Sequence, residues 1–289
     1  MSAHDLAVIV TTHNRAAQLD EALSCLSRQV WDNGTWEVLV VDNNSTDSTS
    51  EVLQRWEHAM PTDFRAISAL ERQGPSYARN TGVAATAAVS VAFLDDDDLV
   101  ADGWVAAIGN ALRTEELVGS RFDHHRLNSP AVANAANVQA QGLGRAFGSP
   151  AVSGGGLGCR RSLWQRVGGS DEGLRFGEDI DFSLRATAAG AAPAFCTDAV
   201  YHPRLSEQTA AAFRRGRQHG LASVDLFVRH GRANGATTDP IGLLAKVAVG
   251  FITRIPSLAD RRVRVAYAEQ LGRRIGRLHG SLRQRVWYP

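Results

Sequence analysis

Four consecutive carboxylates, Asp95–Asp98, follow an apolar segment at residues 89–94. Carboxylates this close repel one another, so leaving them without a partner is costly and a cation is their natural counterion. Mg²⁺ or Mn²⁺ typically takes one or two protein carboxylates and completes its shell with water and phosphate oxygens. The run would equally serve as a solvated acidic turn that caps a helix beginning at Trp104. Taken alone, it leaves both interpretations open.

A second acidic pair, Glu178 and Asp179, follows Gly177 at the expected start of a helix. The positive end of the helix dipole favours an ionised carboxylate, which suits a general base, and plain helix capping is the alternative. His202, just before Pro203, could complete a metal shell through a ring nitrogen, although a lone histidine is more often structural.

Three further side chains are candidates for binding a nucleotide. Asp42 ends an apolar segment, where its oxygens could accept a hydrogen bond from a pyrimidine base or form a local turn. Arg15 and Arg79 could reach diphosphate oxygens, or could be surface residues. The glycine-rich run at residues 153–158 lacks both G-x-G-x-x-G and the P-loop pattern, so close approach to a sugar or a strand bulge are the alternatives there.

The elements that must position these residues alternate along the first hundred residues. Short apolar segments predict buried strands at residues 6–11, 37–41, 64–68 and 89–94. Helical spacing predicts helices at residues 16–28, 48–58, 75–87, 104–113, 162–167 and about 177–190, with Pro75 in a first turn and Ser45 or Thr46 as a cap. This α/β alternation predicts a doubly wound, mainly parallel sheet flanked by helices. Ligands of such sheets lie at the carboxyl ends of the strands, where residues 11–15, 42–45 and 95–98 all fall.

The rest of the chain predicts a second unit. Residues 121–150 lose their periodicity and read as a long loop, and the chain beyond His202 reads as helical. We therefore expect a first domain at 1–203, with one half at about 1–100 and a second half at about 101–203. A basic helical region at 204–289 follows.

The composition is that of a soluble globular protein, with 44% hydrophobic residues and a net charge of +1 over 289 residues. Acidic residues predominate up to residue 203 and arginine predominates after it, which suggests different partners or only a coding bias. Three widely spaced cysteines and no secretory signal favour a reduced, cytoplasmic setting over a disulfide framework.

Five segments, taken in order, resemble the inverting glycosyltransferases of family 2, which have the GT-A fold. These segments are VIVTTHNR (8–15), VLVVDNNSTDST (38–49), GPSYARNTGV (74–83), VAFLDDDDLV (91–100) and FGEDIDFSLR (176–185). The resemblance covers roughly residues 6–203. It implies a GT-A domain that uses Mn²⁺ or Mg²⁺ and a nucleotide-sugar donor, with UDP as the expected carrier.

The resemblance also implies roles for single residues. Asp95 and Asp97 fill the acidic positions of a D-x-D motif, with Asp97 as the metal ligand and His202 as a second one. Asp179 falls at the catalytic-base position, with Glu178 beside it. The residues expected to contact the nucleotide are Thr11, His13, Arg15, Asp42, Asn44, Arg79, Asp95 and Asp96.

The chain departs from the processive members of that family, because it has neither their Q-x-x-R-W motif nor several membrane spans. We therefore expect one sugar per acceptor, the acceptor being a small molecule, a glycan, a lipid-linked molecule or a peptide. Two alternatives remain: a metal-dependent nucleotidyltransferase or phosphohydrolase, and a non-catalytic nucleotide-sugar-binding relative.

The basic region contains an apolar segment, Ile241–Thr253, interrupted by Lys246 and followed by an arginine-rich helix. Thirteen residues are too short to span a bilayer. The segment could lie at the inner face of an anionic membrane, pack on the catalytic domain or form a homo-oligomer contact. Nucleic-acid binding is not expected, because no aromatic residues are interleaved with the arginines.

Overall fold

The computed structural model describes residues 4–135, 139–231 and 261–288. The chain forms two compact units, the first comprising Met1–Arg126 and Val138–Arg204, the second Leu127–Asn137 and Leu205–Pro289. The division at Arg204 lies next to the boundary expected from the sequence. Residues 127–137, however, belong to the second unit rather than to the domain expected at 1–203.

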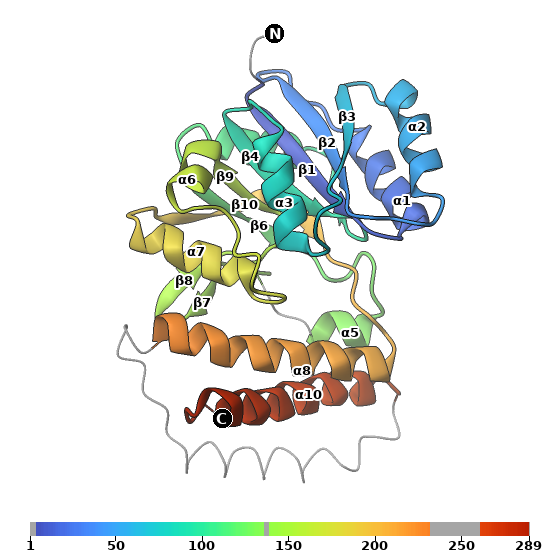
Figure 1. Ribbon diagram of the computed structural model, residues 1–289. Coiled ribbons are helices and arrows are strands. Elements are labelled where there is room, and N and C mark those ends of the chain that lie inside the picture. The colour runs from blue at the N-terminus through green and yellow to red at the C-terminus, as the bar shows by residue number, and fades with distance from the viewer. Residues whose placement is uncertain (1–3, 136–138, 232–260, 289) are drawn as a thin grey trace. The chain divides into compact units, whose positions relative to one another are not determined.

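Unit 1 is built on an eight-stranded sheet with helices on both faces (Figure 1). Its strand order is β3-β2-β1-β4-β9-β6-β10-β5. The first four strands in this order are parallel, β9 runs antiparallel between β4 and β6, and β5 runs antiparallel to β10. The strands are β1 (Leu6–Thr12), β2 (Trp36–Asp42), β3 (Asp63–Ser68), β4 (Ser90–Asp95), β5 (Leu99–Val100), β6 (Leu117–Phe122), β9 (Leu157–Arg160) and β10 (Pro193–His202). The predicted α/β fold is confirmed.

The helices of unit 1 lie where the sequence predicts them, with ends shifted by a few residues. They are α1 (Ala16–Leu26), α2 (Thr49–Ala59), α3 (Pro75–Ala84), α4 (Trp104–Ala111), α6 (Arg161–Arg166) and α7 (Glu178–Ala188). Pro75 occupies the first turn of α3, as predicted. The predicted cap of α2 is wrong. It is Asp47 that accepts hydrogen bonds from the Thr49 backbone N–H, at 3.1 Å, and from the Ala16 N–H at the start of α1, at 3.0 Å.

The expected loop at residues 121–150 is also wrong. It contains the end of β6, the short helix α5 (Pro130–Ala135) and a hairpin of β7 (Gly144–Ala146) and β8 (Ser149–Ala151). Strands β6, β9 and β10 escaped prediction for physical reasons. Strand β9 has four residues, β6 contains Gly119, Ser120 and Arg121, and β10 is interrupted by a bulge between Cys196 and Val200. Each therefore lacks the uninterrupted apolar run of a central strand.

The core of unit 1 covers both faces of the sheet. Leu6, Val8 and Val10 of β1 point into one cluster, while Ala7 and Ile9 point into the other. A strand buried on both faces reads as a continuous apolar run, which is why the sequence identifies β1, β2 and β4 so clearly. The three cysteines of the chain are free.

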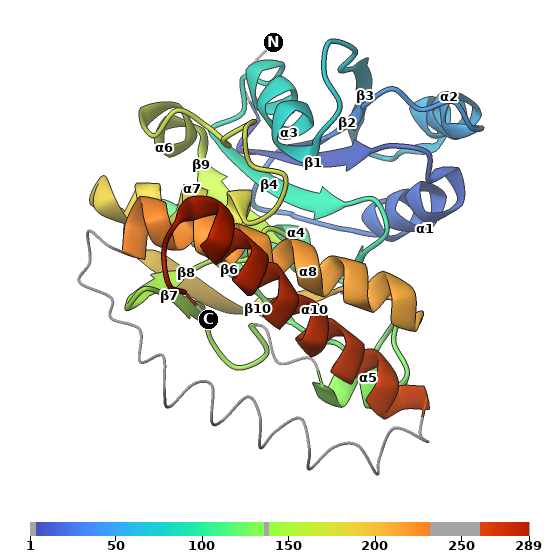
Figure 2. The same ribbon diagram turned by 60° about the horizontal axis from the view of Figure 1, so that its bottom comes forward.

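Unit 2 is helical, and α8 (Thr209–Leu226) and α10 (Arg261–Gln284) lie side by side (Figure 2). Glycines line their contact. A Cβ added to Gly216 would lie 2.1 Å from the carbonyl oxygen of Glu269, and one added to Gly276 would lie 2.1 Å from that of Arg217. The two backbones therefore touch directly, an arrangement that only glycine allows.

The helical tail predicted from the sequence is confirmed for α8 and α10. The apolar segment Ile241–Thr253 lies outside the described residues. Among the helices that the structure describes, none combines the length and the apolar character needed to cross a membrane.

Candidate active site

The carboxyl ends of β1, β2 and β4 meet at one level of the sheet. In the strand register, Thr12 lies opposite Asp42 and Thr11 lies opposite Asp95. The polar residues that follow these strands therefore share one rim, as the sequence predicts.

The aspartate run divides into a buried pair and a more exposed pair. Asp96 accepts a hydrogen bond from the Thr12 hydroxyl at 2.8 Å, and Asp98 accepts one from the Tyr201 hydroxyl at 2.6 Å. Asp95 and Asp97 keep 35% and 27% of their side-chain surface exposed. Alternate carboxylates of the run are thus partly exposed at the rim, while the other two anchor the turn.

Arginines supply part of the counter-charge for this run. The Arg15 Nη1 atom lies 2.8 Å from both Asp96 Oδ1 and Asp97 Oδ2. Arg79, which is buried, donates to Asp95 Oδ1 at 3.0 Å and to Glu178 Oε1 at 2.7 Å. The run is therefore already paired with cations of the protein itself, so repulsion among the four carboxylates is no argument on its own for a metal.

The exposed carboxylates could still contribute to a metal site. Burial raises the pKa of Asp97 to about 6, with Arg15 opposing the shift and the charges of Asp95 and Asp96 adding to it. Within the described ranges, no group of three or more His, Cys, Asp or Glu side chains is placed to hold a metal. Because Mg²⁺ and Mn²⁺ accept one or two carboxylates and take phosphate oxygens and water for the rest, Asp95 and Asp97 fit such an ion only together with a bound diphosphate.

Asp179 is the second residue of α7, and two backbone donors hold its carboxylate. Its Oδ2 accepts a hydrogen bond from the Gly154 N–H at 2.6 Å, and its Oδ1 accepts one from the Ile180 N–H at 2.8 Å. Burial raises its pKa to about 6, and the neighbouring charge of Glu178 adds to this shift. A carboxylate with this pKa is ionised at neutral pH yet is more basic than an ordinary aspartate.

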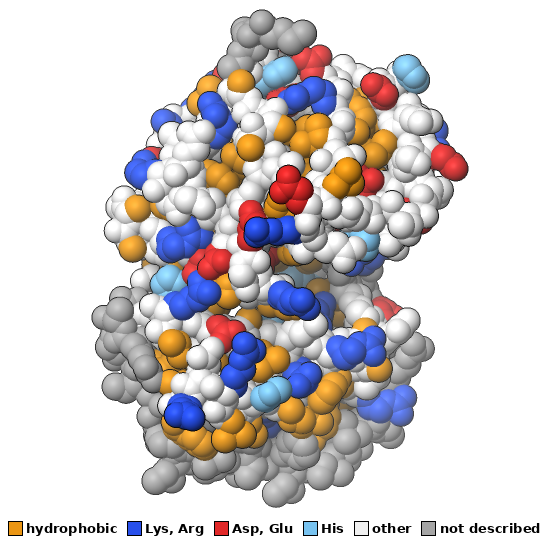
Figure 3. All heavy atoms as spheres, in the orientation of Figure 1, with side chains coloured by type: hydrophobic (Ala, Val, Ile, Leu, Met, Phe, Trp, Pro, Cys, Tyr) orange, Lys and Arg blue, Asp and Glu red, His pale blue; other side chains and the backbone are white. Residues whose placement is uncertain are grey.

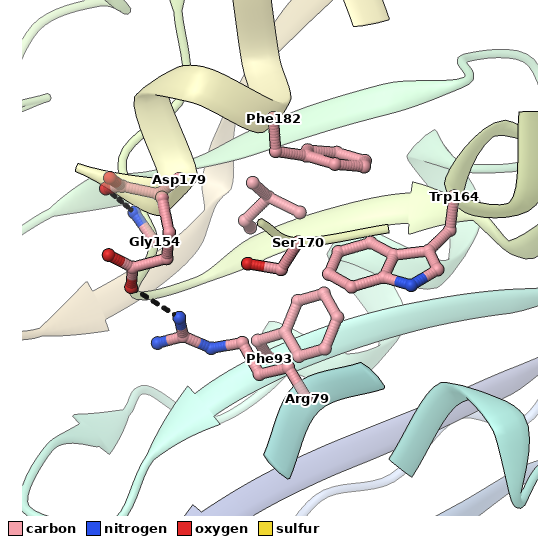
Figure 4. A pocket seen from close by; sticks show the side chains of 9 residues that line it. Arg79, Phe93, Gly154, Trp164, Ser170, Asp179 and Phe182 are labelled. Carbon is pink, nitrogen blue, oxygen red and sulfur yellow. Dashed lines mark hydrogen bonds and ion pairs between the residues drawn. The ribbon is translucent and has the colours of Figure 1, made fainter. Parts of the chain in front are cut away.

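A small cavity lies beside this carboxylate (Figure 4). Its lining includes the apolar side chains of Phe93, Trp164 and Phe182 and the charged groups of Arg79 and Asp179. Its volume of about 10 Å³ leaves room for one water molecule at most. The cavity therefore places apolar side chains beside the Asp179 carboxylate and is too small to hold a substrate.

The glycine run is explained by the side chains that pack against it. A Cβ added to Gly155 would lie 2.7 Å from the Tyr201 hydroxyl oxygen, and Gly156, at φ +68°, would meet Ser120 Oγ at 2.7 Å. The close approach predicted for this run is thus to the protein's own side chains. Tyr201 was not among the predicted residues, because its burial in β10 and its bond to Asp98 leave no local signal in the sequence.

The loop after β2 is held chiefly by Asn43, which the sequence did not single out. Its side-chain amide donates to the carbonyl oxygens of Ala69 and Arg72, each at 2.6 Å. The predicted residue Asn44 makes a longer bond of 3.2 Å to the carbonyl of Ala69. The Asp42 carboxylate accepts the Ser45 N–H at 3.0 Å, which is the local turn that the sequence left as one alternative.

Two histidines at the rim are also positioned by neighbours. His13 Nδ1 lies 2.8 Å from the Asn43 carbonyl oxygen, which sets the orientation of its ring. His202, at the end of β10, has its Nδ1 3.2 Å from Asp123 Oδ2. Burial lowers the pKa of His202, with Asp123 opposing the shift, so the neutral imidazole that a metal requires is favoured.

Comparison with known proteins adds independent evidence. The sequence profile of glycosyl transferase family 2 matches residues 7–155, which include the aspartate run and the start of the glycine run. Glycosyltransferase AglE of Haloferax volcanii is 27% identical over 222 residues, covering 73% of this chain and 72% of AglE. Other curated relatives match over smaller parts of their own length, from 16% to 58%.

Solved structures show the fold. The mannosyltransferase PcManGT from Pyrobaculum calidifontis, in complex with GDP-Man and Mn²⁺, superposes with a TM-score of 0.63 at 19% identity, covering 94% of this chain and 88% of that one. Staphylococcus aureus TarS 1–349 in complex with UDP-GlcNAc superposes with a TM-score of 0.55 at 18% identity, covering 99% and 93%. The fold is GT-A-like, with a mostly parallel sheet flanked by helices. The chain belongs to glycosyl transferase family 2.

Proposed function

We propose that this glycosyltransferase moves a single sugar from a nucleotide-sugar donor to an acceptor with inversion, assisted by Mn²⁺ or Mg²⁺. One observation carries the proposal. Arg79 binds Asp95 on one side and Glu178 on the other, at 3.0 and 2.7 Å. The D-x-D turn and the helix start that bears Asp179 are thereby fixed on opposite sides of one guanidinium group.

On the donor side, Asp97, together with Asp95, would hold the ion that stabilises negative charge on the departing diphosphate. Arg15 is 46% exposed and can exchange its contact with Asp97 for one with phosphate oxygens. Asp96 would lie near the ribose. Thr11, His13, Asp42, Asn44 and Arg79 would line or support the nucleotide, and His202 would be a second metal ligand.

On the acceptor side, Asp179 would take the proton from the attacking hydroxyl at one of its carboxylate oxygens. Attack on the face opposite the leaving group would give inversion. UDP is the carrier we propose first, because the aligned TarS complex holds UDP-GlcNAc, with GDP as the alternative from the PcManGT complex.

The first test is donor binding. Incubation with UDP- and GDP-sugars, with and without Mn²⁺, should raise the melting temperature for one donor and produce slow donor hydrolysis. The products discriminate between functions. A nucleoside diphosphate supports sugar transfer, whereas a nucleoside monophosphate would support the alternative phosphohydrolase, and no binding of any donor would overturn the proposal.

The second test is Asp179→Asn, which should keep donor binding while reducing turnover by at least about a hundredfold. The wild-type rate should fall about tenfold per pH unit below pH 6, since the base must be ionised and burial raises its pKa to about 6. Asp198→Asn, at an exposed carboxylate of β10, is the matched control. Unchanged turnover in the Asp179 variant would remove this residue from the base role.

A further inference from the structure

An exposed apolar row lies on the second half of α10. Ile275, Leu278 and Leu282 are spaced three and four residues apart, so they share one face of the helix. They are 38%, 45% and 80% exposed, and Trp287, just beyond the helix, is 45% exposed. An exposed apolar row of this kind marks a surface that contacts another molecule or a membrane.

The row continues into an open groove of about 620 Å³. Tyr267 and Leu271 of α10 and Phe213 of α8 line this groove. Tyr267 and Leu271 are eight and four residues before Ile275, on the same helical face. Together, Tyr267, Leu271, Ile275, Leu278 and Leu282 form one continuous surface, which we call the α10 strip.

Arginines border the α10 strip in the part of unit 2 that the structure describes. Arg214 and Arg264 lie at the groove and Arg283 is exposed beside Leu282. The acidic residues of α8 and α10 are Asp225 and Glu269, and Glu269 is bound by Arg215 at 2.7 Å and Arg273 at 2.8 Å. Figure 3 shows the resulting mixture of hydrophobic and basic side chains over α8 and α10.

These charges select among partners. A second copy docked through the α10 strip would bring arginines near arginines, and the acidic residues that the structure describes on α8 and α10 already have partners within the unit, Asp225 in Gln284 and Glu269 in Arg215 and Arg273. Nucleic acid would neutralise the arginines, but the leucines of the α10 strip would stay exposed to water. An anionic bilayer offers phosphate groups at the level of the arginines and an apolar phase just beneath them.

We propose that unit 2 binds the surface of an anionic membrane through the α10 strip. The leucines and isoleucine enter the acyl-chain boundary, and Arg214, Arg264 and Arg283 contact lipid phosphates. This inference does not depend on the proposed sugar transfer. The α10 strip does not include the segment Ile241–Thr253, for which the sequence suggested a membrane contact.

The test is co-sedimentation of the full chain with vesicles of phosphatidylcholine alone or mixed with phosphatidylglycerol. Binding is expected only to the mixed vesicles and should weaken as salt is raised. Equal binding to both vesicle types, or binding to neither, would overturn the proposal.

Two pairs of substitutions separate the contributions. L278Q/L282Q should reduce vesicle binding at least about tenfold, because two apolar side chains no longer enter the lipid. R264Q/R283Q should reduce it by about fivefold per arginine. The matched control is Leu70→Gln, at a leucine of unit 1 that is 66% exposed and should leave binding unchanged.

Circular dichroism measures whether the variants fold. Folding is expected, because Leu278 and Leu282 are exposed and their replacement removes little core packing. The strip would instead contact a second copy of the chain if the wild type self-associates and does not bind vesicles, and if L278Q/L282Q is monomeric. Quenching of tryptophan fluorescence by brominated lipid tests membrane insertion without changing the strip. If Trp287 enters the lipid, the quenching should be smaller in Trp287→Phe than in the wild type. Equal quenching would count against insertion of this end of α10.

Discussion

Arg15 Nη1 and Asp97 Oδ2 lie 2.8 Å apart at the rim of the sheet. This ion pair should affect how the site binds a metal ion and a phosphate group. An arginine beside a candidate metal ligand competes with the metal for the same carboxylate. The same arginine is suited to bind the donor diphosphate. Its effects on the metal and on the donor should therefore have opposite signs.

Arg15→Gln should tighten Mn²⁺ binding in the absence of donor by several-fold and weaken donor binding by about tenfold. Titration calorimetry with Mn²⁺ alone, and then with the donor in saturating Mn²⁺, measures the two effects separately. Arg55→Gln, which removes an exposed arginine paired with Asp20, is the control. A variant that loses both affinities together would instead show that Arg15 only stabilises the turn.

Asp97 should also shape how stability depends on pH. Its pKa is raised from 3.8 to about 6 in the folded chain, so the folded state binds the proton more tightly than the unfolded state does. The resulting stabilisation is complete below about pH 4 and is lost as pH rises through about 6. The melting temperature should therefore fall between pH 5 and pH 7.5.

Asp97→Asn should make that fall smaller, although Asp179, whose pKa is also raised, keeps part of it. Mn²⁺ together with donor should restore stability at pH 7.5 in the wild type more than in the variant. Scanning fluorimetry at the two pH values measures both effects. The same pH difference in wild type and variant would show that Asp97 does not titrate in this range.

At this scale the sequence predicts the acidic and basic residues of the site but not how they pair. The position of Asp95–Asp98 at a strand end follows from the apolar run before it. The bonds from Tyr201 to Asp98 and from Gly154 to Asp179 join residues about 100 and 25 positions apart. No local pattern encodes such pairs, because they depend on the placement of β9 and β10.

Strand β10 contacts the turn at Asp95–Asp98, although it lies far along the chain. Its Tyr201 is fully buried, and just after β10 the backbone N–H of Arg204 binds Asp98 while its Nε donates to the Asp97 carbonyl at 2.8 Å. These bonds tie the turn to the far half of the sheet. We regard Tyr201 as a positioning residue for the D-x-D turn.

Tyr201→Phe should leave the Asp98 carboxylate short of a donor, at a cost of about 1–3 kcal/mol in stability. Donor affinity in the presence of Mn²⁺ should fall several-fold as the turn loosens, while acceptor affinity should hardly change. Tyr288→Phe, which removes a hydroxyl from unit 2, is the control. A stability loss without a loss of donor affinity would leave Tyr201 with a structural role only.

Strands are predicted correctly where both faces of the strand are buried, because the sequence is then continuously apolar, as in β1, β2 and β4. It fails where a strand is short, bulged or interrupted by polar residues that contact neighbouring elements. Ser120 of β6 is such a residue, since its hydroxyl donates to the Gly156 carbonyl at 2.7 Å inside the core. The second half of the sheet is thus specified by contacts between distant segments.

Over the whole molecule, the glycine contacts of α8 and α10 distinguish unit 2 from unit 1. Gly276→Ala should destabilise unit 2 by about 1–3 kcal/mol or more, because its Cβ would meet the Arg217 backbone. Gly142→Ala, where a Cβ meets nothing within 4 Å, is the matched control and should be neutral. Thermal unfolding followed by circular dichroism measures both, and equal melting temperatures would mean that the helices separate without cost.

Because α8 and α10 meet backbone to backbone, their interface needs almost no large side chains. An ordinary helix pair must reserve a leucine-rich stripe on each helix for its partner. Here glycine fills that role, so long side chains are left for the outer faces. A helix can then be densely arginine-rich and still pack firmly. Polar composition in this region is therefore a poor guide to how well the unit folds, and its outer surface can change character without altering the scaffold beneath.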